Sequence, residues 1–115
     1  MDRNELLTKI NLTRGFETQS RQLSEEVGEL LQAVNKLWRD TTKNGTFGCP
    51  KEFTPNIHPT LYRRVLTVSQ ELADVLNMVE GLAIILHCEV EMKRYANLKL
   101  EREYERLCGT ILDKP

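Results

Sequence analysis

Apolar residues recur at spacings of three and four along two long segments of the 115-residue chain, and this period constrains the fold most strongly. Over about 18–39 the stripe consists of Leu23, Val27, Leu30, Leu31, Val34, Leu37 and Trp38. Over about 60–87 it consists of Val65, Val68, Leu72, Val75, Leu76, Val79, Leu82, Ala83 and Leu86. A stripe with this period buries one face of a helix, so both segments are predicted to be amphipathic helices.

Two further helices are predicted near the ends of the chain. Asp2 can cap a helix over residues 3–13, in which Leu6, Leu7 and Ile10 share a face. Arg14-Gly15 is a predicted break, because glycine readily takes the left-handed conformation that ends helices. A charged helix over about 89–107 keeps one apolar stripe, which consists of Met92, Ala96, Leu100, Tyr104 and Leu107.

Residues 40–59 interrupt the helical pattern. They contain two glycines and three of the chain's four prolines, residues that stop helices and favour turns. The segment is therefore predicted to be mostly loop, with two interpretations open: a lid or binding segment, or a surface insertion. The expected fold is one all-α domain over 1–115, a bundle of about four helices with this Pro/Gly-rich loop.

The end of the second long helix predicts self-association. The run LAIIL at 82–86 is apolar nearly all round. A helix of that kind is buried from several sides, which a monomer of 115 residues can hardly achieve. We therefore expect a homo-oligomer assembled through this helix.

Charge and composition exclude several classes of protein. With 16 basic and 17 acidic residues the net charge is -1, so the chain lacks the basic excess of a dedicated nucleic-acid binder. It contains no run of 18 apolar residues, so we expect no membrane span. The N-terminal MDRNELLTKI is polar and lacks the apolar core of a signal peptide, which predicts a cytoplasmic protein.

Cysteine and histidine usage argues against thiolate and di-iron metal sites. Cys49, Cys88 and Cys108 are odd in number and form no CxxC pair, so we interpret them as reduced thiols. Neither His58 nor His87 follows a glutamate by three residues, so the Glu-x-x-His pairs of di-iron bundles are absent from the sequence.

Two carboxylate pairs stand beside the apolar stripes of the long helices. Glu26 and Glu29 are three residues apart on one helix. Glu71 and Asp74 have the same spacing on the other, so each pair projects from one helix face and the pairs converge if the stripes pack together. Close carboxylates repel unless a cation binds or protons are retained. Oxygen ligands alone favour Mg²⁺ or Mn²⁺ over zinc; the alternative is a solvated acidic face.

The segments SEEVGELLQAVNK and QELADVLNMVEGLA place EExxE before ExxD, each on a helix. This arrangement resembles the MazG-like nucleotide pyrophosphohydrolases of the all-α NTP pyrophosphatase superfamily, and the resemblance covers roughly residues 14–100. It implies a helical bundle that forms dimers or tetramers, with Mg²⁺ held by Glu26, Glu29, Glu71 and Asp74. By the same resemblance, Glu25 and Glu26 are candidate catalytic residues, with Glu25 orienting water or supporting the ligands.

The resemblance also implies substrate-binding residues. Lys93 and Asn97 match a Lys/Asn pair that contacts phosphates in family members, although Lys93 also fits an ordinary exposed lysine. Asn77 would contact the nucleotide or satisfy a core hydrogen bond. Trp38 would stack on the base or pack in the core.

Two features depart from the family pattern. The 41 residues between Glu29 and Glu71 exceed the separation in compact members, and the loop accounts for the difference. Met78 stands where some relatives have an aromatic residue, which argues against a dCTP-specific enzyme.

The predicted activity is Mg²⁺-dependent hydrolysis of an NTP or dNTP to the monophosphate and pyrophosphate, in nucleotide-pool house-cleaning. One alternative is a non-catalytic helical interaction protein, in which the acidic pairs are surface charge. The other is a phosphoribosyl-ATP pyrophosphatase, from the same superfamily.

Overall fold

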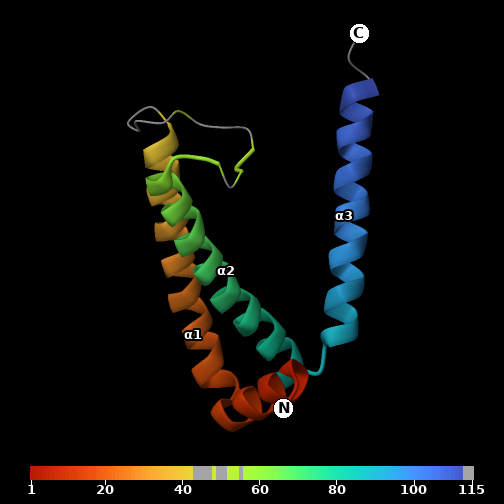
Figure 1. The fold of residues 1–115 in the computed structure, drawn as a ribbon. Helices are drawn as coiled ribbons and strands as arrows, with labels where there is room; N and C mark the ends of the chain where they lie inside the picture. Colours follow the sequence, from red (N-terminus) through yellow and green to blue (C-terminus); the bar gives the residue numbers. More distant parts are fainter. Residues whose placement is uncertain (43–47, 49–51, 55, 113–115) are drawn as a thin grey trace.

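Three helices make up most of the residues that the computed structural model describes, which are 1–42, 48, 52–54 and 56–112 (Figure 1). α1 spans Arg3–Thr41, α2 spans Pro59–Ile85 and α3 spans Glu89–Leu112. The described part contains no strand, which confirms the all-α class. Cys49 and much of the predicted loop lie outside the described residues.

α1 contains the predicted break, at which two helical segments meet in a kink. Asp2 caps its start, accepting a hydrogen bond of 2.8 Å from the backbone N–H of Glu5. Gly15 has φ 83° and ψ 169°, a backbone conformation that favours glycine. Gly15 thus separates two helical segments at a kink, which confirms the predicted break; counted as continuous elements, the described residues form three helices rather than about four.

The break turns the first part of α1 across the C-terminal end of α2 (Figure 1). We call this segment, Arg3–Arg14, the N-terminal arm. Arg3 anchors it through an ion pair of 2.9 Å with Glu80 on α2. Asn11, almost fully buried, lies against Gly81, where any side chain on α2 would collide with it.

α1 and α2 pack against each other along their length, whereas α3 contacts only α2, and only slightly. At the far end of the α1–α2 pair, Arg64 holds Asp40 through an ion pair of 2.8 Å. The buried apolar core is small and lies between these two helices; it consists of Leu7, Ala33, Leu61, Met78, Ala83 and Ile84.

The single chain is open. Its radius of gyration is 18.2 Å, against about 13 Å for a compact domain of this length. Several residues of the apolar stripes are consequently exposed, among them Leu31, Val34 and Trp38 on α1, Leu72, Leu76 and Val79 on α2, and Leu100, Tyr104 and Leu107 on α3. Their helical spacing was predicted correctly, but no element of the described chain covers them.

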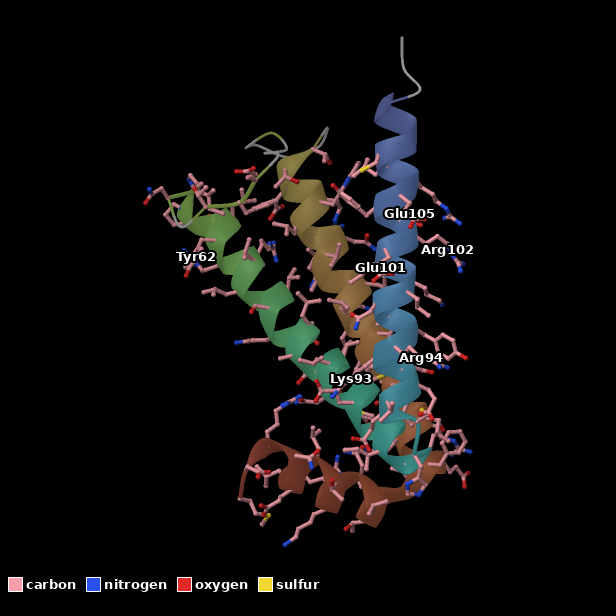
Figure 2. All side chains as sticks on the ribbon, turned by 90° about the vertical axis from the view of Figure 1, so that its right-hand side faces the viewer. Tyr62, Lys93, Arg94, Glu101, Arg102 and Glu105 are labelled. Atoms are coloured by element: carbon pink, nitrogen blue, oxygen red, sulfur yellow. The ribbon has the colours of Figure 1, made fainter. Side chains whose placement is uncertain are left out.

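α3 stands apart from the α1–α2 pair (Figure 1), and charged side chains, including those of Lys93, Arg94, Glu101 and Arg102, project from it (Figure 2). Among the described helices, none is long and apolar enough to span a membrane.

Candidate metal centre and adjoining pocket

Facing sides of α1 and α2 bring the two carboxylate pairs together. Each pair is spaced by three residues, so both of its members project from the same side of their helix. Glu26 and Glu29 come from α1, and Glu71 and Asp74 come from α2. One oxygen from each of the four carboxylates lies within 4.8 Å of the oxygens from the other three.

Two oxygens of this cluster are buried without a hydrogen-bond partner. Glu26 accepts a hydrogen bond of 2.8 Å at Oε1 from Nε2 of Gln22. Its Oε2 accepts none from the described residues, and neither does Oε2 of Glu71. Buried polar atoms in folded proteins nearly always have partners, so the cluster needs either a cation or a retained proton, such as one on Glu29, whose pKa is raised by the charges of Glu26 and Glu71 and in part by hydrogen bonds to the same two residues.

The cluster also alters the acidity of Glu29. The negative charge of Glu26, followed by that of Glu71, raises the pKa of the Glu29 carboxyl above its ordinary value of 4.5. Like charges disfavour the ionised form of a neighbouring acid, and a bound cation reverses this effect. The electrostatics of the cluster are therefore those of a group of acids that lacks a counter-charge.

These observations fit a hard divalent cation. All four groups offer oxygen ligands, the donors that Mg²⁺ and Mn²⁺ prefer. A cation among them would give the orphaned oxygens of Glu26 and Glu71 a partner and offset the repulsion at Glu29. Exposed acidic groups are common without a metal, so the buried oxygens are the distinguishing feature of this cluster.

A pocket of about 850 Å³ adjoins the carboxylates and extends under the N-terminal arm. This volume lies within the range of small-molecule sites, roughly 300–1,000 Å³. Glu26 and Asp74 line the pocket, so it is continuous with the candidate metal centre. Its walls combine apolar side chains from the arm with amides from α1 and α2 and with two arginines, Arg3 and Arg14.

The structure places only one of the predicted substrate residues in this pocket. Asn77, one turn after Asp74, lines it together with Met78. Asn77 is exposed rather than in the core, while Met78 is buried. Glu25 is exposed and belongs neither to the cluster nor to the pocket wall.

The other predicted substrate residues lie elsewhere in the single chain. Trp38 is 58% exposed and lines a separate pocket of about 460 Å³ with Gln32, Asn35, Lys36 and Arg39. Lys93 and Asn97 are exposed on α3 and line neither pocket.

Several polar residues of the pocket were not predicted as site residues, and all of them lie on α1 before Glu25: Arg3, Asn11, Arg14, Thr18, Gln19 and Gln22. Two signals in the sequence could have indicated them. Gln22 precedes Glu26 by four residues and therefore shares its face. Asn11 follows Leu7 by four residues and so places an amide on the apolar face of the arm.

Comparisons with known proteins give no relative: no family model, no curated protein and no solved structure matches the chain.

Proposed function

We propose that the protein is a Mg²⁺-dependent nucleoside triphosphate pyrophosphohydrolase. The observation that supports this most is the cluster of Glu26, Glu29, Glu71 and Asp74, with two orphaned buried oxygens and a ligand-sized pocket beside it. Magnesium commonly binds proteins through a few carboxylates together with substrate phosphates. The order of EExxE and ExxD in the sequence, which resembles the MazG-like enzymes, adds the nucleotide as substrate.

The residues of the chain have separate tasks in this proposal. The four carboxylates would hold the cation, which when bound would supply positive charge beside the substrate phosphates and lower the pKa of a water molecule. Gln22 fixes one oxygen of Glu26 and so orients that ligand. Glu25 would orient the attacking water by the resemblance alone, since in the single chain it is exposed and lies outside the cluster and the pocket wall. Arg14, on the pocket wall, offsets negative charge of the substrate.

A panel of NTPs and dNTPs, with phosphoribosyl-ATP included, tests the activity. Incubation with Mg²⁺ is expected to release pyrophosphate and the monophosphate from at least one nucleotide, and chelation of the metal should stop the release. Exclusive turnover of phosphoribosyl-ATP would favour that alternative within the superfamily. Release of orthophosphate, or no turnover of any substrate, would contradict the proposed reaction.

We also propose that the working protein is a homo-oligomer. The run at 82–86, through which the sequence predicts association, is partly covered within the single chain, since Ala83 and Ile84 are buried. The open shape and the exposed apolar stripe of α3 support association instead, because apolar surface of this kind marks association sites. Lys93 and Asn97, which line neither pocket of the single chain, would then contact phosphates in the site of another copy. The same association would cover Trp38 or bring it to a base.

A charge placed in the α3 stripe tests the assembly. Leu100 is 69% exposed in the single chain, and burying a leucine contributes about 1.5–3 kcal/mol. A symmetric dimer loses the burial energy of Leu100 in both copies. Leu100→Glu should therefore raise the Kd of the dimer by about 100-fold or more, as measured by sedimentation velocity. Arg102→Glu is the control, because Arg102 is exposed on α3 (Figure 2) and is not one of the stripe residues. A wild-type protein that sediments as a monomer at all concentrations would refute the assembly.

The rival function, a non-catalytic interaction protein, is favoured by the same exposed apolar surface. An interaction protein needs no cation at the carboxylates. Binding of Mg²⁺ in the absence of nucleotide therefore distinguishes the enzyme from the interaction protein.

A further inference from the structure

Three groups in the pocket wall form a chain of hydrogen bonds that ends on an atom without a partner. Asn11 donates from Nδ2 to the backbone carbonyl of Leu7 at 2.7 Å. Gln19 donates from Nε2 to Oδ1 of Asn11, also at 2.7 Å. The remaining oxygen, Oε1 of Gln19, is buried and accepts no hydrogen bond from the described residues.

The direction of this chain is fixed by its first member. A backbone carbonyl can only accept, so Asn11 must present its NH₂ group to Leu7 and its oxygen to Gln19. Gln19 must in turn present its NH₂ group to Asn11. Flipping either amide would set two donors or two acceptors against each other. The atom left over at Gln19 is therefore an acceptor, and what satisfies it must be a donor.

Packing holds this arrangement in place. Asn11 and Gln19 are each only 2% exposed. Gly81 of α2 lies so close to the Asn11 side chain that a Cβ at this position would overlap with it. The glycine thus lets α2 support Asn11 directly, and through it the orientation of Gln19.

The surroundings of Gln19 define the shape of the missing partner. Gln19 lines the 850 Å³ pocket, as do Leu6, Ile10 and Met78, whose apolar surfaces suit the faces of a flat ring. The same pocket reaches Glu26 and Asp74 of the candidate metal centre. One ligand can therefore place a ring under the N-terminal arm and an anionic group beside the carboxylates.

We propose that the pocket under the N-terminal arm is the nucleobase subsite, and that Oε1 of Gln19 accepts a hydrogen bond from an N–H group of the base. Asn11 and Gly81 are positioning residues that hold the Gln19 amide in its orientation. The inference rests on the proposed function and deepens it, because it states which part of the nucleotide this pocket selects. A site built around a buried polar group rejects ligands that leave the group unpaired.

Gln19→Met tests the acceptor, since methionine keeps the length and apolar body of glutamine. For the nucleotide that the wild type prefers, KM should rise about tenfold with kcat nearly unchanged, because a buried hydrogen bond made in both ground and transition states is lost. Gln70→Met is the matched control: Gln70 is exposed on α2 and lines neither pocket. Circular dichroism checks that each variant is folded.

Gly81→Ala tests the positioning role without altering a pocket residue. The added methyl group must displace Asn11, so KM should rise in the same direction as for Gln19→Met and discrimination among bases should narrow. Gly28→Ala is its control, because nothing lies within 4 Å of a Cβ at that helical glycine. A Gly81→Ala protein that is less stable but keeps the wild-type KM for every base would show that Gly81 has a structural role alone.

Two further measurements keep this inference separate from the proposed reaction. In the wild type, an analogue of the preferred nucleotide that lacks the N–H donor should show the same rise in KM as Gln19→Met. If no nucleotide is hydrolysed, the reaction is refuted, and binding of the four nucleoside monophosphates in EDTA is followed by ligand-observed NMR. Binding that weakens in Gln19→Met supports the subsite; no binding, or equal binding by both proteins, overturns it.

Discussion

Glu29→Gln is expected to lower pyrophosphate release by at least about 1,000-fold, while the metal-free protein becomes no less stable than the wild type. Glutamine keeps the size of the side chain but removes one negative ligand of the cation, whose stabilisation of transition-state charge is several kcal/mol. In the absence of metal the same change relieves repulsion from Glu26 and Glu71, the two charges that raise the Glu29 pKa. Steady-state kinetics and thermal unfolding measure the two effects.

The opposite signs of these effects distinguish a metal ligand from a structural residue. Loss of a structural residue would lower activity and stability together. Glu101→Gln serves as the control, since Glu101 is exposed on α3 (Figure 2) and should change neither quantity. Full activity in Glu29→Gln would remove this residue from the ligand set.

The raised pKa also predicts a pH dependence for the metal-free protein. The folded state binds the Glu29 proton more tightly than the unfolded state, whose carboxyl has the ordinary value of 4.5. Protonated Glu29 therefore contributes to the stability of the folded protein at low pH. This contribution is lost as the pH rises from about 4.5 through the folded-state pKa. In Glu29→Gln this part of the pH dependence should disappear, and saturating Mg²⁺ should suppress it in the wild type.

Magnesium alone is expected to stabilise the folded protein strongly. A ligand that binds only the folded state contributes about 2.7 kcal/mol at 100 times its Kd. For a domain of this size each kcal/mol shifts Tm by about 4 °C or more. A rise in Tm of about 10 °C is therefore expected, and calorimetric scans across a Mg²⁺ titration measure it.

The rise in Tm that Mg²⁺ causes by binding to the cluster must be distinguished from a general effect of ionic strength. Glu71→Gln, which neutralises a half-buried member of the cluster, should abolish most of the shift. Sodium chloride of equal ionic strength should not reproduce it in the wild type. A wild-type Tm that is indifferent to Mg²⁺ would favour the non-catalytic interaction protein.

The sequence was sufficient for what depends on local spacing. The apolar period gave the position of each helix to within a few residues, and Gly15 marked the break in α1. The three-residue spacing also put Glu26 beside Glu29 and Glu71 beside Asp74. These features follow from the geometry of one helix, in which residues three apart are neighbours whatever the rest of the chain does.

The direction of the chain before the Gly15 kink and the contents of the pocket did not follow from spacing. A glycine with positive φ can end a helix or merely bend it, and the outcome depends on what the bent segment packs against. Here the arm is held across α2 by Arg3 and by the contact of Asn11 with Gly81. That packing brings Gln19 into the pocket wall.

The sequence by itself thus determined three things about this protein: an all-helical chain, two carboxylate pairs on amphipathic helices, and apolar stripes in excess of what a small core can bury. Tertiary structure decided which faces meet. It joined the two pairs into one cluster, left oxygens of Glu26 and Glu71 without partners, and aligned Asn11 and Gln19 into a directed chain. The physical reason is that the helix period sets the direction in which each side chain projects. Whether a side chain is buried, and which groups it contacts, depends on the packing of a second helix against it.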